Sequence, residues 1–316
     1  ADNLYLKTGT EWHYRRGGFN FNQWQQSFTD WYNGSFVEAE WKPAGRLAVR
    51  AGLRGDFSSH LRQWRAMPRL SLAWSTGEFS QISLAWGQFY QAPPAEFMRQ
   101  ARNFGFEKAT HYLANYQWMT SRFTFRAEGY FKDYRQLLRQ RAAAGEFPAV
   151  FDNTGFGHAA GLDIFWRDKK AFGLLDYWLT YSYLHAGRRY RDFASYLPPR
   201  FAAEHTAQFV SQLKIPRTSL QVGASFSFSS GRPYYFGPEH PRWSGDRTPA
   251  FFQTGLNASY LTSLFRQFAV IYVSADNPFG WKNISSYRFS SDFSQRRAVL
   301  PPIGRSFFAG LFLNFR

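Results

Sequence analysis

The stretch of residues 155–183 constrains the fold of this chain more than any other. Its side chains alternate with a period of two residues both before and after one charged connection. From His158 to Trp166 every second side chain belongs to a mostly apolar face, and from Tyr177 to Tyr183 the alternation returns. A period of two is that of a β-strand, and each half is about as long as a tilted strand needs to cross a bilayer. The stretch therefore predicts a long antiparallel hairpin, closed by a tight connection over residues 168–173.

The same pattern recurs along the chain and predicts about fourteen strands, with six short turns between them and seven long connections. Short and long connections alternate strictly, the long ones being roughly 15–31, 56–67, 91–108, 135–153, 185–204, 229–250 and 277–303. This asymmetry is typical of outer-membrane barrels. We therefore predict an all-β fold: a portion of a transmembrane antiparallel β-barrel with short periplasmic turns and long extracellular loops, located in a bacterial outer membrane.

The aromatic content supports this prediction. Phe, Trp and Tyr make up 21% of the chain, which includes 35 Phe and 12 Trp. Membrane barrels need such a supply for the girdles at both interfaces, and their polar lumen keeps the mean hydropathy low, as it is here. No run approaches eighteen apolar residues, so we expect no transmembrane helix. The chain has no Cys, which excludes disulfides, thiolate metal sites and thiol nucleophiles.

The formal net charge of +16 comes from basic residues that are scattered over strands and loops. Because they do not gather on one helix or in one run, nucleic acid is not the expected partner. Anionic lipid headgroups, lipopolysaccharide and anionic ligands fit the distribution better.

Alternation also assigns the two faces of the wall. We expect Leu162, Ile164, Leu220 and Val222 to face lipid, and Asp163 and Gln221 to face the interior. The interior should also hold the cations Arg46, Arg50, Arg54, Arg126 and Lys132, with the carboxylates Glu38, Glu40 and Glu128 as their partners.

Few residues suggest catalysis. The seven His are dispersed, and His111, His158 and His205 lie in strand patterns where packing against aromatic rings is the expected role. The glycines near residue 155 do not form a phosphate loop, because no helix follows, and they more simply relieve crowding in a curved strand. We expect no catalytic residue, no metal ligands and no cofactor, and therefore no enzyme.

The long loops are the better place for a binding site. Two stretches combine guanidinium groups with aromatic rings, which can clamp a planar or anionic ligand by charge-assisted hydrogen bonds and stacking. The candidate ligand contacts are Arg188, Arg189, Tyr190, Arg191, Arg232, Tyr234, Tyr235, His240, Trp243 and Arg247. Two alternatives remain open at this point: the same residues could bind lipopolysaccharide phosphates, or they could only support the loops.

Several motifs, in this order and at this spacing, carry a resemblance to a known family. They are F-Y-Q-A-P-P-A-E-F from Phe89, G-Y-F-K-D-Y from Gly129, N-T-G-F-G-H-A-A-G-L-D-I-F-W from Asn153, S-G-R-P-Y-Y from Ser230 and S-A-D-N-P-F-G from Ser274. Together they make the chain similar to the C-terminal part of the β-barrel of a TonB-dependent outer-membrane receptor of the Bacteroidetes type.

The resemblance implies a barrel of about 22 strands that is filled by a plug domain. Residues 1–316 would then be a single barrel domain, the C-terminal portion of that barrel, without the plug and the early strands. The first and last strands would each pair with a strand absent from this sequence, so that the chain alone is an open, curved sheet.

The same resemblance implies the function and the partners. The protein would take up a bulky ligand, such as a siderophore, haem, cobalamin, a glycan or a peptide. Its partners would be outer-membrane lipid, lipopolysaccharide, an unknown extracellular ligand and the TonB complex, which acts through a plug not in this sequence. A self-contained fourteen-strand pore or surface-binding protein is the alternative, and an outer-membrane hydrolase is the third possibility.

Overall fold

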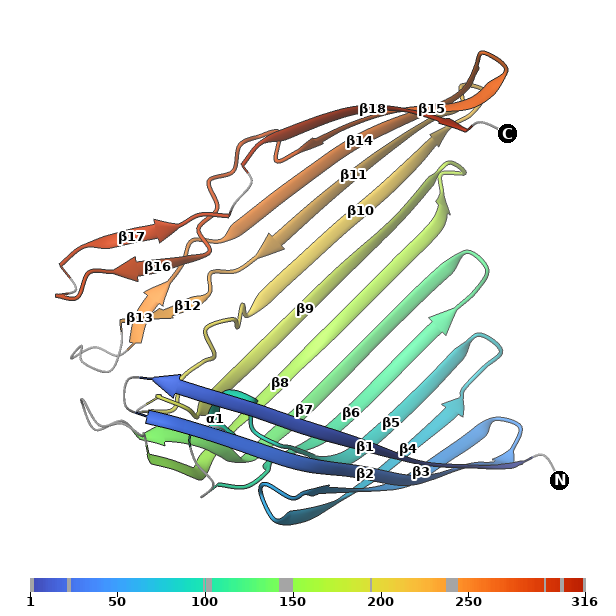
Figure 1. The fold of residues 1–316 in the computed structure, drawn as a ribbon. Helices are drawn as coiled ribbons and strands as arrows, with labels where there is room; N and C mark the ends of the chain where they lie inside the picture. The colour runs from blue at the N-terminus through green and yellow to red at the C-terminus, as the bar shows by residue number, and fades with distance from the viewer. Residues whose placement is uncertain are drawn as a thin grey trace. The chain divides into compact units, whose positions relative to one another are not determined.

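One antiparallel sheet of fourteen strands dominates the computed structural model (Figure 1). The structure describes residues 3–21, 24–98, 100, 104–141, 150–193, 195–236, 244–292, 294–301 and 304–314. The strands of the sheet are, in order, β1 (Leu4–Phe21), β2 (Trp24–Ala44), β3 (Leu47–Ser58), β4 (Gln63–Ser75), β5 (Ser80–Gln91), β6 (Glu107–Met119), β7 (Phe123–Arg141), β8 (Val150–Ala171), β9 (Leu175–Arg189), β10 (His205–Ile215), β11 (Leu220–Ser229), β14 (Phe251–Leu264), β15 (Gln267–Asp276) and β18 (Ser306–Asn314). The predicted all-β fold and the predicted number of strands are confirmed.

Five small elements lie in the connections. They are the helix α1 (Ala95–Met98), the strand pair β12 (Pro233–Tyr235) and β13 (Ser244–Arg247), and the strand pair β16 (Ser286–Phe289) and β17 (Arg296–Val299). No helix in the described part of the chain has both the length and the apolar character needed to span a membrane.

The chain divides into two compact units. Unit 1 comprises Ala1–Tyr116, Glu128–Ala160 and Ala186–Pro199, and unit 2 comprises Gln117–Ala127, Gly161–His185 and Arg200–Arg316. The expectation of a single barrel domain stays a prediction.

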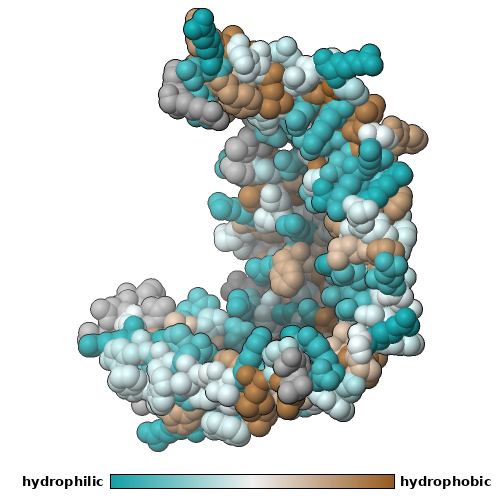
Figure 2. Space-filling model, turned by 90° about the vertical axis from the view of Figure 1, so that its right-hand side faces the viewer, coloured by the Kyte–Doolittle hydropathy of each residue, from teal (hydrophilic) through white to brown (hydrophobic). Residues whose placement is uncertain are grey.

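Side-chain contacts across the ladders follow the predicted alternation. In unit 2, Gln212 Nε2 donates to Gln221 Oε1 at 2.9 Å, and Arg167 donates to both carboxylate oxygens of Asp176. Leu220 and Val222 alternate with Gln221 along β11 and so point to the other side of the sheet. Both hydrophilic and hydrophobic residues are visible on the side of the molecule shown in Figure 2.

Two predicted long loops are wrong, and a third, 135–153, is shorter than expected because β7 continues to Arg141 and β8 begins at Val150. Residues 15–31 are not a long connection, because the β1–β2 ladder continues from Leu4↔Trp41 to Phe21↔Trp24. Residues 56–67 shrink likewise to the turn 59–62 between β3 and β4. Hydrophobic alternation fades in both segments because polar pairs replace it: Arg15 Nη2 donates to Asp30 Oδ2 at 2.6 Å. Strands can continue beyond the bilayer on backbone hydrogen bonds and polar cross-strand pairs alone.

The predicted ion pairs are correct in part. Arg50 Nη2 donates to Glu40 at 2.7 Å and lies 3.6 Å from Glu38, as expected. Arg54 instead pairs with Glu11 and Asp56. Across β6 and β7, Arg126 donates to Gln117, and the Lys132 ammonium lies over the ring of Tyr130.

The periplasmic end of unit 2 carries a belt of aromatic rings. Trp118 and Phe123 stack at 5.9 Å between centroids, Phe123 lies 5.6 Å from Trp166, and the Trp166 indole N–H donates to the Tyr177 hydroxyl. The predicted turn 168–173 is shorter than expected, since β8 continues to Ala171. Its end is fixed by a bidentate ion pair, in which Arg122 donates twice to Asp168 at 2.8 Å.

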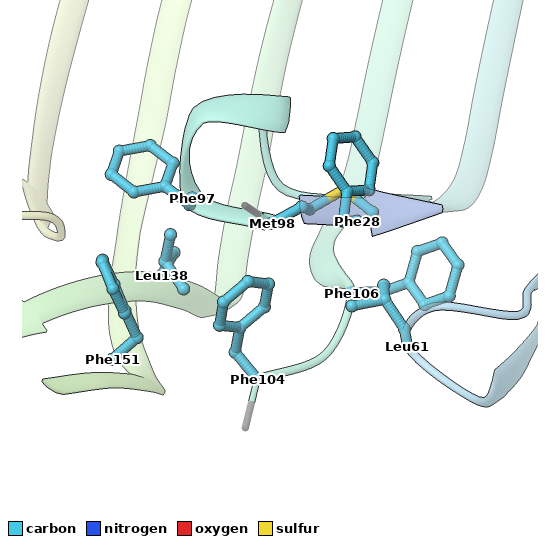
Figure 3. Close-up of a cluster of buried hydrophobic side chains, with 8 residues drawn as sticks. All are labelled: Phe28, Leu61, Phe97, Met98, Phe104, Phe106, Leu138 and Phe151. Carbon is cyan, nitrogen blue, oxygen red and sulfur yellow. The ribbon is translucent and has the colours of Figure 1, made fainter. Parts of the chain in front are cut away.

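An apolar core lies at the outer end of unit 1, where β2, β7 and β8 meet the loops β3–β4 and β5–β6. Its eight side chains point toward one another in Figure 3, and they are Phe28, Leu61, Phe97, Met98, Phe104, Phe106, Leu138 and Phe151. The rings of Phe97 and Phe104 both meet Phe151 edge-on. The loop that carries α1 is therefore packed rather than free, and it provides a base for the residues described next.

Candidate functional site

The first candidate site, here called the arginine cluster, consists of Arg188, Tyr190 and Arg191 with Tyr134 and Glu107. All five belong to unit 1. Beyond β9 the chain continues beside the outer end of β7, where Arg191 adopts a positive φ of 51° and forms a parallel bridge with Arg139. The Arg191 N–H donates to the Leu138 carbonyl at 2.6 Å, and the Gln140 N–H donates to the Arg191 carbonyl at 3.0 Å.

Two glycines of β8 allow this close approach. A Cβ added at Gly155 would lie 2.5 Å from the Leu137 carbonyl oxygen and 2.7 Å from that of Arg189. One added at Gly157 would lie 2.5 Å from the Gly187 oxygen. The expectation that these glycines relieve crowding is confirmed, because only a residue without Cβ lets the neighbouring backbones come so near.

Aromatic rings orient the guanidinium groups of the arginine cluster. Arg188 Cζ lies 4.2 Å from the centroid of the Tyr134 ring, within the range of a cation–π interaction. Arg191 Cζ lies 5.5 Å from the Phe97 ring, which belongs to the apolar core, and 5.6 Å from the Tyr190 ring. Both guanidinium groups thus lie against aromatic faces, which fixes the orientation of their planar sets of N–H donors.

Glu107 is the carboxylate of this cluster. It is the first residue of β6, and the last nine to eleven residues of that strand suffice to cross a bilayer, so it lies outside the membrane-spanning part. Burial raises the pKa of the Glu107 carboxyl, while the Leu138 N–H that it accepts and the nearby Arg191 and Arg188 act in the opposite direction. Arg189, next along β9, is half-buried. Cations outnumber carboxylates here, which suits an anionic ligand.

A second candidate site, here called the hairpin cluster, lies in unit 2 between β12–β13 and β16–β17. The ring of Tyr234 lies 4.9 Å from Tyr287 and 5.9 Å from Phe289, and its hydroxyl accepts a hydrogen bond from Arg296 Nη1 at 3.1 Å. The same guanidinium lies 4.3 Å from the Tyr287 centroid. Tyr234 is buried by these contacts, so this cluster fastens two outer hairpins together.

A third feature, here called the loop pocket, is a cavity of about 1030 Å³ in unit 2, between β14, β15 and β18 and the loop that joins β15 to β18. Asp276, Trp281, Lys282 and Arg305 contribute charged and aromatic groups to its lining. Its walls are held by an amide clamp, because the side chain of Asn277 accepts from the Trp281 N–H and donates to the Trp281 carbonyl.

A second amide clamp holds the next turn of the same loop. The side chain of Asn283 accepts from the Phe252 N–H and donates to the Phe252 carbonyl, so it occupies the position of a neighbouring strand. The loop pocket therefore has a defined polar wall. Directional hydrogen bonds, rather than apolar packing, hold this wall in position.

The structure divides the ligand contacts expected from the sequence into two groups. Arg188, Arg189, Tyr190 and Arg191 belong to unit 1, and Arg232, Tyr234, Tyr235 and Arg247 belong to unit 2. His240 and Trp243 lie outside the described residues. Tyr235 is buried like Tyr234, and Arg247 is engaged by Glu204 and by the Gly231 carbonyl.

Sequence reasoning missed several members of these clusters. Tyr134, Glu107 and Phe97 join the arginine cluster from β7, β6 and α1, and Tyr287 and Arg296 join the hairpin cluster. The only signal was the mixture of Arg and aromatic residues in several of the outer loops. His111, His158 and His205 pack against Phe89, Tyr196 and Tyr181, as expected. Within the described residues, no three His, Asp or Glu side chains are placed to hold a metal ion.

These features first define a class of protein. Fourteen antiparallel strands, which short turns join at one end and, from β5 onward, longer connections join at the other, form a portion of a transmembrane β-barrel of the bacterial outer membrane. Residues 3–277 match the family model of the TonB dependent receptor-like β-barrel. The chain belongs to that family. No curated protein sequence matches it.

Solved structures of outer-membrane transporters are similar to this chain at low sequence identity. The transporter YddB from Escherichia coli has a TM-score of 0.73 at 8% identity, over 98% of this chain and 50% of its own. The FrpB iron transporter from Neisseria meningitidis has a TM-score of 0.73 at 13% identity, over 98% and 52%. A mutant ferric enterobactin receptor, PfeA from Pseudomonas aeruginosa, in complex with enterobactin, has a TM-score of 0.75 at 13% identity, over 98% and 51%. The chain thus spans about half the length of these structures.

Proposed function

We propose that the protein carrying this chain is a TonB-dependent outer-membrane transporter that takes up a bulky, anionic ligand. The family and the barrel wall support transport through the outer membrane, and the similar structures are transporters and receptors. In this proposal the wall makes and breaks no bond. It presents the ligand-binding groups, and a plug outside this sequence would open the path when the TonB complex acts on it.

The arginine cluster is the observation that carries the ligand chemistry. Arg188 rests on Tyr134, Arg191 rests on Phe97, and both guanidinium groups act on the carboxylate of Glu107. Stacked guanidinium groups bind planar carboxylates, phosphates and catecholates through parallel N–H donors, and the aromatic rings add stacking area. Iron transport by FrpB and enterobactin binding by PfeA make a ferric catecholate the first ligand to try.

The test uses the purified whole protein and two ferric siderophores of different charge. Anionic ferric enterobactin should bind, whereas uncharged ferrichrome should not, and binding should weaken as salt is raised. Arg188→Gln should lower the affinity for the anionic ligand by about tenfold or more, since a hydrogen bond to a charged group contributes about 1.5–3 kcal/mol.

The matched control is Arg217→Gln, which removes a cation from a periplasmic turn and should leave siderophore affinity unchanged. Equal binding of the two siderophores, or equal effects of the two substitutions, would contradict the assignment of the ligand to the arginine cluster.

A further inference from the structure

Three consecutive turns at the periplasmic end of unit 2 form a surface, here called the turn row, that neither the wall nor ligand uptake requires. The turns join β8 to β9, β10 to β11 and β14 to β15. Because β9 pairs with β10 and β11 pairs with β14, the three turns are neighbours along one edge of the sheet. Adjacent turns are two strand spacings apart, which is about 10 Å.

The first and third turns each present a phenylalanine to solvent. Phe172 is 94% exposed and Phe265 is 91% exposed, the highest values among the exposed large hydrophobic residues of the described chain. Neither side chain contributes to a core. Burial therefore does not explain why an aromatic residue stands at these positions.

Backbone conformation does not explain the phenylalanines either. Phe172 has a φ of 49° and is followed by Gly173 at 81°, and Phe265 has a φ of 52° and is followed by Arg266 at 62°. Two successive residues with positive φ make a turn in which Asn and Gly are preferred, and a bulky side chain there is strained. Strain that recurs at equivalent positions of two turns points to a role for the side chains themselves.

Each of the three turns carries or adjoins an exposed cation. Lys170 lies at the end of β8, two residues before Phe172, and Arg217 and Arg266 lie in the second and third turns. The two carboxylates nearby are already engaged, since Asp168 binds Arg122 and Asp176 binds Arg167. The turn row therefore presents an excess of positive charge together with exposed aromatic rings.

The depth of the turn row suits the headgroup region of the membrane. The belt formed by Trp118, Phe123, Trp166 and Tyr177 marks the hydrocarbon boundary at this end. Phe172 lies five residues before Tyr177 of that belt, which corresponds to about 16 Å of extended chain and to about 12 Å along the membrane normal for a strand tilted by about 40°. The headgroup layer is about 5–8 Å thick on each side of the bilayer, so the turn tips lie at its periplasmic surface, from which long Lys and Arg side chains reach the phosphate groups.

We propose that the turn row binds anionic phospholipid of the periplasmic leaflet. The exposed cations contact the phosphate groups, and the rings of Phe172 and Phe265 pack among the headgroups beside them. Charge complementarity and position beside the aromatic belt favour a lipid over a periplasmic protein as the occupant.

The experiment measures lipid selectivity of the whole protein in reconstituted phosphatidylcholine membranes. Spin-labelled phosphatidylglycerol is compared with spin-labelled phosphatidylcholine by electron paramagnetic resonance. The intact protein should prefer phosphatidylglycerol by about fivefold, the factor that one cation at a membrane surface supplies. The triple substitution Lys170→Gln, Arg217→Gln and Arg266→Gln should bring the ratio close to one.

A second variant tests the rings by a substitution that relieves backbone strain and so does not endanger folding. Phe172→Asn with Phe265→Asn places in both turns the residue that their φ values prefer, so thermal stability should stay equal or rise while the fraction of motionally restricted lipid falls for both lipids. The matched control is Phe279→Asn, at a ring that is 65% exposed in an outer loop, and it should leave that fraction unchanged. A ratio of one for the intact protein, a preference that survives the triple substitution, or an unchanged fraction of restricted lipid in the double Phe variant would overturn the proposal and would favour a periplasmic protein as the occupant.

Discussion

The outer ends of the two units are held by different forces. In unit 1 the loop with α1 is packed into an apolar core in which Phe106 and Phe151 are each 1% exposed. In unit 2 the longest loop is held by the amide clamps of Asn277 and Asn283, and the other outer hairpins are joined through Tyr234 and Arg296.

This difference shows two ways of fixing long loops above a membrane wall. Apolar packing is non-directional and stabilises in proportion to buried area, so it gives a firm base on which Arg188 and Arg191 can be oriented. Hydrogen-bond clamps fix particular backbone atoms but contribute less net free energy each, because the same groups would otherwise bind water. We therefore expect the outer end of unit 1 to be the more stable of the two. In unit 2, the loss of one hydrogen-bond clamp should affect only the residues around it.

The largest effect should come from breaking the apolar core of unit 1. Phe106→Ala leaves a cavity among the eight packed side chains, which should destabilise this region by about 3–5 kcal/mol. Hydrogen exchange of residues 92–98 and 104–106 and of the arginine cluster should accelerate, while the loop pocket in unit 2 keeps its protection. Phe279→Ala, at an exposed ring, is the matched control and should change stability by about 0.5 kcal/mol or less. Equal effects would mean that the core does not hold the loop.

The two units differ in their outer loops, but the membrane-spanning strands of both should have one face toward lipid. Leu220→Arg in β11 should cost about 2–4 kcal/mol and impair assembly in the outer membrane, because it places a charge against acyl chains. Gln221→Arg, one residue further on, points to the side where Gln221 meets Gln212 and should be tolerated. Assembly yield in membranes measures both, and identical losses would show that the alternation is misassigned.

A smaller effect should follow from removing one amide clamp of unit 2. Asn277→Gly keeps a residue that accepts the positive φ of 50° but removes the two hydrogen bonds to Trp281, at a cost of about 1–3 kcal/mol for the groups left unpaired. Exchange of residues 277–284 should accelerate, and unit 1 should be unaffected. Asn277→Ala adds backbone strain to the same loss and should be worse. If residues 277–284 exchange as slowly in the Asn277→Gly variant as in the intact protein, the clamp does not hold this loop.

The smallest effect concerns the turn of the β16–β17 hairpin. Hydrogen bonds from Ser290 and Ser294 lower the pKa of Asp292 from its ordinary 3.8 to about 2. Because the pKa is lowered in the folded state, the contribution is present above about pH 4 and is lost as the pH falls toward 2. Amide exchange of the hairpin, corrected for its intrinsic pH dependence, should accelerate over that window. Asp292→Asn should abolish this pH dependence and leave the rest of unit 2 unchanged, and a pH response that persists in the variant would assign it to another group.

The sequence by itself determined the wall of this protein. Alternation of side chains is a local property with a period of two, and a bilayer imposes the length of each apolar segment, so the strands around Trp166, Tyr177 and Leu220 could be located from residue order alone. The polar face followed from the same alternation, as the pair Gln212–Gln221 illustrates. The motifs were enough to recognise the family.

Only the tertiary structure decided what lies at the two ends of the wall. The continuation of β1 and β2 past the bilayer depends on cross-strand partners such as Arg15 and Asp30, which no local period reveals. The arginine cluster brings Glu107, Tyr134 and Arg188 together from β6, β7 and β9, because Gly155 lets their backbones approach closely. Such contacts depend on the register and curvature of several strands at once, and these are set by packing between distant segments rather than by any one stretch of sequence.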